Sequence, residues 1–441
     1  MQARIRIWPI IGIFMLVSVA WIALSGTMLA RTTSQESSLE GSVGSLWGRP
    51  QTQASPTFIV HWTVRSKKET VVYNSQTKAQ EKKTEWVDVP YERKVEPVSA
   101  DVRSGLALDE RRKGLVWFPL YTVDFSGRYI VDPINPELLD KAAENVEFEI
   151  VTRLPSGDGT YDGFELELNG KDISVKAERQ NGALRYRYAL DKEKGADFMF
   201  SYVSRGVAVW NYQPLSVSQE AGLIENFQLR MTTDFHAIDF PGGTMSPSTK
   251  ERTDEGWILN WAFDRIMTGQ NIGMVMPQRV QPGHLGAKLS ASAPISLGFF
   301  TVVLYVLSFL RGHRIHPIHY MFIGASFFSF HLLFAYTADH LPVEWAFALA
   351  SGTSVVLVVS YLRLVISSRF AFGPVAIAQM IYVVGFSVAH FFEGFTGLSI
   401  TVLGITTLFW LMQITGKIDW YEKTAGPGPD LSNPELEATP S

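Results

Sequence analysis

Four ionisable side chains in the last third of the chain could do chemistry within or beside a membrane. His331, His390, Glu393 and Asp339 lie inside or next to long apolar stretches. Ionisable groups at membrane depth are uncommon and usually face the interior of a helix bundle. These side chains therefore predict either a proton relay or substrate gate, or hydrogen bonds between helices near the interface, where water is close.

Three more histidines, His313, His316 and His319, recur every third residue. Such spacing could place metal ligands on one face of a helix. Pro317 interrupts the run, and the alternative interpretation is a turn that caps a helix and contacts lipid headgroups. We expect no bound metal and no cofactor.

Carboxylates also alternate along two strand-like segments, and glycoside hydrolysis requires a pair of carboxylates. They are Glu147, Glu149, Glu165 and Glu167. Alternation is also typical of the solvated face of a strand, and we interpret these residues in that way. The sequence shows none of the short patterns of serine hydrolases, zinc proteases, P-loop enzymes or dinucleotide-binding enzymes. The chain has no cysteine, which excludes disulfides and thiol nucleophiles.

Six apolar stretches are long enough to cross a bilayer, and none contains Asp, Glu, Lys or Arg. The stretches are Ile7–Ala30, Ile295–Leu310, Ile318–Ala338, Trp345–Leu362, Ala371–Phe392 and Phe395–Thr415. A hydrocarbon core needs about 20 such residues in a helix. Backbone amides find no water there, so the stretches should be helical. The sequence therefore predicts an integral membrane protein.

The orientation follows from the lysine and arginine content of the short loops. Arg4 and Arg6 precede the first stretch, and Arg311, Arg363 and Lys417 follow later ones on the same predicted side. The loops on the other side carry neither lysine nor arginine. We predict that both termini are cytoplasmic. The first stretch could alternatively be a cleaved signal peptide, but its length favours a retained anchor.

The polar middle of the chain predicts a large exported domain. The expected organisation is a transmembrane anchor (1–30), a periplasmic β-rich domain (31–292), a five-helix transmembrane bundle (293–416) and a cytoplasmic, partly disordered tail (417–441). The fold class is thus an antiparallel β-rich extracytoplasmic domain plus a bundle of six transmembrane helices, one N-terminal and five C-terminal.

Alternating residues and turn dipeptides give the strand predictions of this domain. Segments 164–168, 173–177 and 184–188 are separated by Asn169-Gly170 and Asn181-Gly182, which suit tight hairpin turns. They predict a three-stranded meander. The charged run 67–83 predicts a solvated hairpin, 137–145 a short helix, and the Gly/Pro/Ser-rich segment 269–294 a linker into the membrane.

Two membrane-side motifs resemble those of the CreD-like inner-membrane proteins, and residues 110–129 and 240–261 of the polar domain resemble further blocks of that family. The segment His316-Pro317-Ile318-His319-Tyr320-Met321-Phe322-Ile323-Gly324 resembles their His-Pro-x-x-Tyr-x-x-x-Gly, and Ile418-Asp419-Trp420-Tyr421 resembles their exit from the last span. The resemblance implies a role in envelope integrity, in envelope-stress responses under a two-component system, and in tolerance to colicins and some antibiotics. It implies no catalytic residue. The matched residues His316, Pro317, Tyr320, Gly324, Asp419, Trp420 and Tyr421 would form a turn, a helix start and interfacial anchors.

We therefore expect a non-enzymatic inner-membrane protein that supports envelope integrity by binding an envelope component or partner through its exported domain. Its partners would be the lipid bilayer and an envelope protein or lipid, and the net charge of −4 gives no reason to expect nucleic acid. The alternatives are a transporter or lipid-handling permease, and a membrane enzyme that acts on an envelope polymer or lipid.

Overall fold

The computed structural model describes residues 7–74, 79–133, 143–157, 159–189, 194–214, 223–313, 315–392, 394–416 and 418. The chain divides into two compact units. One is helical and contains Met1–Gln35 and Val280–Ser441, and the other is built from sheets and contains Glu36–Arg279. The predicted tail, apart from Ile418, lies outside the described residues.

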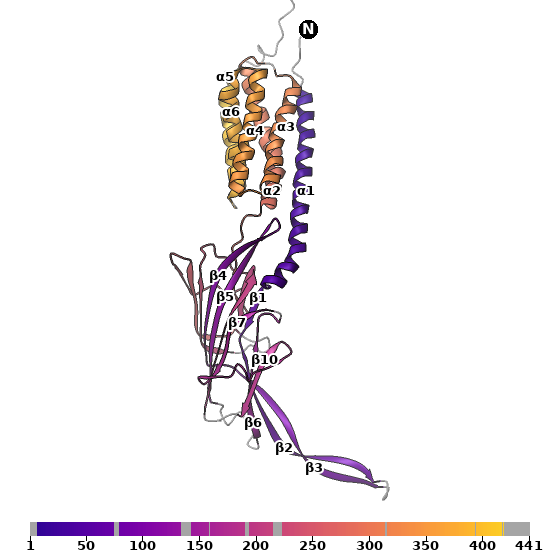
Figure 1. Cartoon of the computed structure of the whole chain (residues 1–441), viewed down its shortest axis with the longest axis vertical. Helices are drawn as coiled ribbons and strands as arrows, with labels where there is room; N and C mark the ends of the chain where they lie inside the picture. Colours follow the sequence, from indigo (N-terminus) through magenta and orange to yellow (C-terminus); the bar gives the residue numbers. More distant parts are fainter. Residues whose placement is uncertain are drawn as a thin grey trace, which may run out of the picture. The chain divides into compact units, whose positions relative to one another are not determined.

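Six helices in the described part of the chain are long and apolar enough to span a membrane (Figure 1). Five of these spans are α1 (Ile7–Trp47), α2 (Pro282–Leu310), α3 (Pro317–Thr337), α4 (Val343–Val365) and α8 (Thr396–Thr415). The remaining span, Ser368–Phe391, is a succession of α5 (Ser368–Phe370), η2 (Ala371–Val375), α6 (Ala376–Gln379), η3 (Met380–Gly385), α7 (Phe386–Val388) and η4 (Ala389–Phe391). The segments η2 and η3 are π-helical turns.

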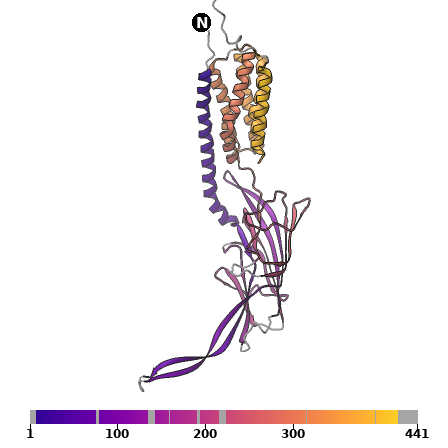
Figure 2. The same ribbon diagram turned by 180° about the vertical axis from the view of Figure 1, so that it is seen from behind.

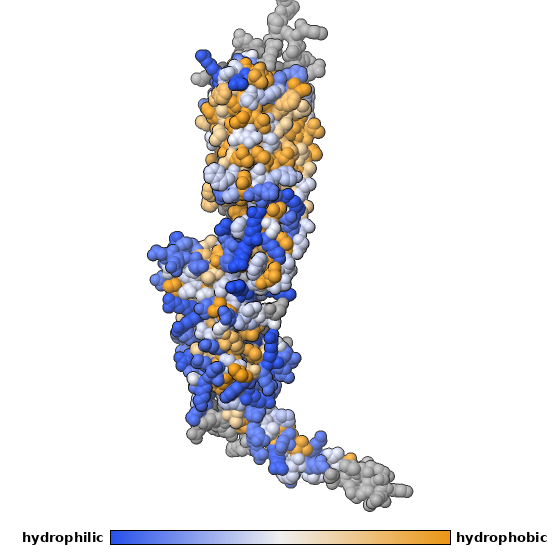
Figure 3. Space-filling view, in the orientation of Figure 1, coloured by the Kyte–Doolittle hydropathy of each residue, from blue (hydrophilic) through white to orange (hydrophobic). Residues whose placement is uncertain are grey.

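Aromatic and aliphatic side chains fill the centre of the helical unit. Phe300, Phe327 and Phe330 are completely buried, and the rings of Phe300 and Phe327 lie 4.8 Å apart. Many other large apolar side chains remain exposed on this unit, which is why its surface is largely orange in Figure 3. An exposed apolar belt is what a bilayer requires of a helix bundle.

The first helix packs closely against two glycines of α2. A Cβ atom at Gly283 would collide with the side chain of Thr32, and one at Gly286 with that of Met28. The Ser25 hydroxyl also donates a hydrogen bond of 2.9 Å to the carbonyl of Ala287. Small residues allow such close approach between membrane helices.

The described residues of the other unit form three sheets (Figures 1 and 2). The strands are β1 (Gln51–Ala54), β2 (Thr57–Asn74), β3 (Ala79–Val95), β4 (Ser99–Lys113), β5 (Val116–Val131), β6 (Ala143–Arg153), β7 (Tyr161–Leu168), β8 (Lys171–Asp172), β9 (Glu178–Gln180), β10 (Ala183–Ala189), β11 (Ala196–Val207), β12 (Val209–Gln213), β13 (Ile224–Thr233), β14 (Thr249–Arg252), β15 (Trp257–Ile266) and β16 (Ile272–Val275). The sheet orders are β1-β12-β16, β3-β2-β6-β10-β9 and β14-β15-β13-β4-β5-β11-β7-β8. All pairs are antiparallel except β1–β12 and β4–β13. The predicted fold class, a β-rich domain plus six apolar helices, is confirmed.

An aromatic core lies against the inner face of the eight-stranded sheet. Phe125 and Tyr202 stack with ring centroids 5.2 Å apart, and both are buried. The hydroxyls of Tyr129 and Tyr212 are 3.0 Å apart and bond to each other. The alternating burial of β4 and β5 follows from the period of two along a strand, so their outer residues are left for solvent.

The predicted meander is wrong, although both of its turns are correct. Asn169-Gly170 joins β7 to β8, Asn181-Gly182 joins β9 to β10, and all four residues have positive φ. The two hairpins belong to different sheets, so no meander forms. Residues 173–177 form no strand, because the amides of Lys176 and Ala177 turn back to the carbonyl of Ile173.

Several predicted boundaries also differ from the structure. The helix that begins at Ile7 continues past Ala30 to Trp47 and ends where Gly48 adopts φ of 107°. The predicted linker 269–294 contains β16 and the first turns of α2, because Pro282 suits the first helical position and the following glycines pack against α1.

Two other predicted segments lie only partly within the described residues. Residues 143–145 of the predicted short helix belong to β6, and 137–142 lie outside the described residues. The charged run does form a hairpin, of β2 and β3, and its described side chains are largely exposed.

Candidate functional site

An ion pair joins the first helix to the turn between α3 and α4. The guanidinium of Arg31 lies 2.8 Å from the carboxylate of Asp339, whose side chain is only 10% exposed. The same guanidinium lies over the ring of Tyr336, 5.8 Å from its centroid. Asp339 thus holds α1 beside α3, a role that the sequence did not reveal because the partner is far away along the chain.

His331 is buried in the helical unit and contacts α1. Its Nδ1 lies 3.2 Å from the carbonyl of Phe327 on its own helix, which assigns the proton to Nδ1. The ring of Trp21 meets the imidazole edge-on, with centroids 5.7 Å apart. The indole Nε1–H of Trp21 is buried and has no hydrogen-bond partner among the described residues.

His390 uses the same backbone contact and adds a bond between helices. Its Nδ1 lies 3.2 Å from the carbonyl of Phe386, which again places the proton on Nδ1. Its Nε2 therefore accepts the hydrogen bond of the Ser292 hydroxyl on α2, at 2.8 Å, in place of the carbonyls of Lys288 and Leu289, which lie 3.1 and 3.0 Å from the same hydroxyl. Ser292 was not a candidate in the sequence analysis, because a lone serine carries no signal. Glu393, the remaining candidate, lies outside the described residues.

Aromatic rings fill the space around these histidines. The ring of Phe330 lies 4.7 Å from that of His331 and 5.6 Å from that of Phe347. Phe347 in turn lies 5.2 Å from Phe391, the neighbour of His390. A hydrocarbon barrier does not conduct protons, so this arrangement suits hydrogen bonds between helices better than a relay. The relay stays a prediction.

The motif residues at the start of α3 have local structural roles. The Nδ1 of His316 accepts a bond of 3.3 Å from the amide of Ile318, and Pro317 follows at the first helical position. Tyr320 is buried, and a Cβ atom at Gly324 would press on Val17 of α1. Asp419, Trp420 and Tyr421 lie outside the described residues.

No group of three or more His, Asp or Glu side chains in the described part of the chain could hold a metal ion.

Glu149 corrects the interpretation of the alternating glutamates as a solvated face. Its side chain is only 4% exposed, although Glu147 on the same strand is 46% exposed. His61 Nε2 lies 2.7 Å from the carboxylate, Arg185 3.0 Å and Arg187 3.3 Å. Burial raises the pKa of Glu149, but the hydrogen bonds from His61 and Arg185 and the charge of Arg187 outweigh burial and lower it. This carboxylate is a buried ionic centre of the five-stranded sheet.

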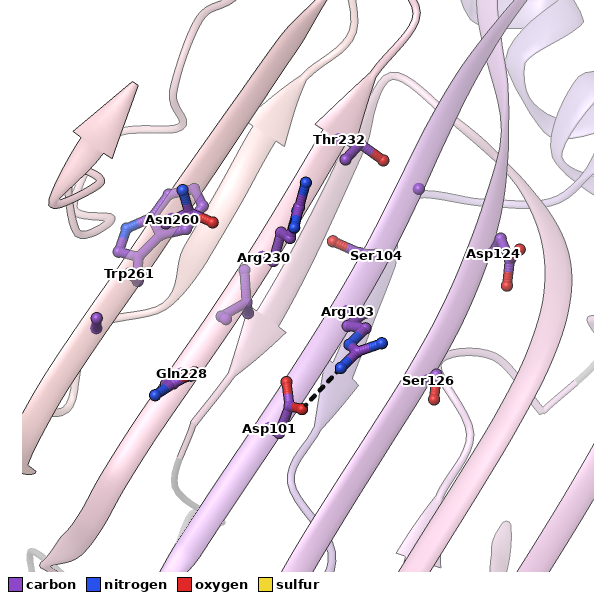
Figure 4. A pocket seen from close by; sticks show the side chains of 13 residues that line it. Asp101, Arg103, Ser104, Asp124, Ser126, Gln228, Arg230, Thr232, Asn260 and Trp261 are labelled. Carbon is purple, nitrogen blue, oxygen red and sulfur yellow. Dashed lines mark hydrogen bonds and ion pairs between the residues drawn. The ribbon is translucent and has the colours of Figure 1, made fainter. Parts of the chain in front are cut away.

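A polar hollow of about 840 Å³ lies on the outer face of the eight-stranded sheet (Figure 4). It extends over β15, β13, β4 and β5. Its outward side chains include Asp101, Arg103, Asp124, Ser126, Gln228, Arg230, Thr232 and Asn260. It is thus a trough of hydrogen-bonding groups with charges of both signs.

Two arginines lie side by side in this hollow. Arg230 of β13 is in register with Arg103 of β4, because these strands pair in parallel. Arg103 Nη2 lies 3.1 Å from the carboxylate of Asp101 (Figure 4). Arg230 makes no ion pair with any described residue. An arginine beside another arginine, with no carboxylate of its own, has donors available for a partner.

Comparisons with known proteins provide one informative match. No curated protein matches the sequence. A Legionella pneumophila structure described as a nutrient-binding protein shares 10% identity, with a TM-score of 0.28, over 44% of this chain and 72% of that one. A Parabacteroides distasonis structure described as a protease shares 11% identity, with a TM-score of 0.24, over 65% of this chain and 59% of that one. Similarities this low carry no argument.

The family comparison is different, because it matches the region that contains both membrane-side motifs. The family model of the inner membrane protein CreD covers residues 291–421. The resemblance predicted from the motifs is thereby confirmed: this is a membrane protein whose residues 291–421 have the sequence pattern of the CreD inner-membrane family.

Proposed function

We propose that this protein is a non-catalytic protein of the bacterial inner membrane that supports envelope integrity. In this proposal its sheet domain faces the periplasm and binds a polar envelope partner in the hollow on the outer face of the eight-stranded sheet. The pair of Arg103 and Arg230 is the observation that carries the proposal. The lining favours a protein or a polar polymer over an acyl chain, because it offers hydrogen-bonding side chains and charges.

The test is complementation of a strain that lacks the gene. Arg230→Glu should leave the amount of membrane-inserted protein unchanged, because the side chain is outside the core. It should nevertheless fail to restore the envelope barrier, measured as leakage of a periplasmic enzyme under mild detergent. Arg252→Glu is the matched control, since Arg252 is exposed on β14 and does not line the hollow. Full restoration by Arg230→Glu contradicts the proposed binding face.

A permease is the second candidate, and the fifth span favours it. Gln379 lies between the π-helical turns η2 and η3 and is completely buried. Its Nε2 donates a bond of 3.1 Å to the hydroxyl of Ser354, while its Oε1 has no partner among the described residues. π-Helical turns occur frequently at functional sites.

Vesicles that contain the full protein would separate the two candidates. Uptake or lipid transfer that is abolished by Gln379→Leu would support the permease. Absence of any transfer, together with loss of barrier function in Arg230→Glu cells, would favour the binding protein.

A further inference from the structure

A second hollow, of about 440 Å³, lies on the surface of the helical unit between α3 and α4. Phe322, Ala325 and Ser326 of α3 line it, with Leu357, Ser360 and Leu364 of α4. Both helices are membrane spans by length and composition. A groove on their outer surface therefore faces hydrocarbon rather than water.

The groove exists because short side chains lie between longer ones. Ala325, Ser326 and Ser360 leave room that larger residues would fill. The two serine hydroxyls do not make it polar, since each donates to a carbonyl of its own helix. Ser326 bonds to Phe322 at 2.9 Å and Ser360 to Leu357 at 3.1 Å. The lining is thus suited to an acyl chain.

One end of the groove is cationic. Arg363, in the last turn of α4, lines this end and is exposed. It makes no ion pair with a described residue. Tyr361 also lines the groove, and its hydroxyl lies 2.7 Å from Nδ1 of His319 in the first turn of α3. The N-terminus of α3 is therefore at the same end, and helix N-termini favour negative charge.

We propose that this groove binds one phospholipid with an anionic headgroup. An acyl chain lies between Phe322 and Leu364, and the headgroup phosphate lies at Arg363 beside the start of α3. A zwitterionic lipid would fill the groove equally well, but its own ammonium group would offset the phosphate charge that Arg363 binds. This site is independent of the binding face proposed above, because it belongs to the helical unit alone.

The test measures lipid binding to the full-length protein by native mass spectrometry, with phosphatidylglycerol and phosphatidylcholine as probes. The wild-type protein should retain phosphatidylglycerol preferentially. Arg363→Gln should weaken phosphatidylglycerol binding by about five-fold, because one basic side chain near the membrane surface contributes about 1 kcal/mol. The control Arg369→Gln removes the same charge from an exposed residue that does not line the groove, and should have no comparable effect.

A second variant tests the acyl-chain part of the site. Ala325→Phe fills the groove and should weaken retention of both lipids, whereas Gly352→Phe, on open surface of α4, should not. Equal retention of the two lipids by the wild-type protein would overturn the headgroup assignment. Unchanged binding in both groove variants would overturn the site.

Discussion

The carboxylate of Glu149 on β6 accepts a hydrogen bond from His61 on β2, with 2.7 Å between Oε2 and Nε2. The other ring nitrogen of His61 lies 3.7 Å from the carboxylate of Glu92 on β3. Three neighbouring strands are thereby joined through one imidazole. The arrangement places an ionic centre on a sheet face where the sequence pattern predicts only solvated side chains.

Acid should loosen this sheet. The pKa of Glu149 is lower in the folded protein than in the unfolded chain. The ionised carboxylate therefore stabilises the fold fully at pH values above the ordinary glutamate pKa of about 4.3. This stabilisation is lost as the pH falls through the lowered pKa of the folded protein. Glu149→Gln should lower the opening free energy of β2 and β6 at neutral pH by about 1–3 kcal/mol and flatten its decline in acid. Hydrogen exchange of the full protein measures both. Glu147→Gln, at a half-exposed position, should change little.

Alkali should destabilise the aromatic core. Burial raises the pKa of Tyr212 to about 12, against about 10 in an unfolded chain. The neutral Tyr212 hydroxyl therefore stabilises the fold below about pH 10, and this stabilisation is lost as the pH rises toward 12. Tyr212→Phe should reduce that alkaline loss and cost about 1 kcal/mol at neutral pH, because its bond to Tyr129 disappears. Denaturant unfolding at several pH values tests this, with exposed Tyr91→Phe as the control. If Tyr212→Phe lost as much stability in alkali as the wild-type protein, the prediction would be wrong.

The Arg31–Asp339 pair should fasten α1 to the bundle. Arg31→Asp and Asp339→Arg should each lower the thermal midpoint in detergent, and the double swap should recover part of the loss. The coupling should be about 1 kcal/mol, since the pair is partly exposed. Glu344→Gln serves as control, because Glu344 is exposed and pairs with no described residue. Strictly additive effects in the double variant would show that the pair is not coupled.

The contact between α1 and α2 should tolerate no side chain at Gly283. Gly283→Leu should lower the thermal midpoint by the equivalent of about 1–3 kcal/mol, because the new side chain collides with Thr32. Gly352→Leu is the matched control, as a Cβ atom at Gly352 meets open space. Equal midpoints for the two variants would argue against close packing of α1.

Local features of the fold could be predicted from the sequence, and its long-range pairing could not. Asn169-Gly170 and Asn181-Gly182 are turns because both residue types accept positive φ, which is a property of the residues themselves. Which sheet each hairpin joins depends on distant partners. The strand β10 pairs with β6 rather than with β7, and no periodicity within either segment encodes that choice.

The same limit applies to the candidate sites. The neighbours Arg103 and Arg230 are brought together by a parallel pairing between strands far apart in the sequence. Glu149 looks like any alternating glutamate until β2 and β10 supply its cations. The intramembrane histidines, in contrast, stood out from the sequence, because a polar residue in an apolar stretch is conspicuous by itself.

Membrane sidedness is the most direct test of the whole account. The chain has no cysteine, so one introduced thiol reports one position. Val175→Cys is suitable in the sheet domain, since Val175 is 95% exposed, and Arg369→Cys is suitable in the short helix α5, where Arg369 is exposed. In intact cells, a maleimide that cannot cross the inner membrane should label position 175 and should reach position 369 only after that membrane is permeabilised. Labelling of position 369 but not of position 175 in intact cells would contradict a periplasmic sheet domain and the envelope role built on it.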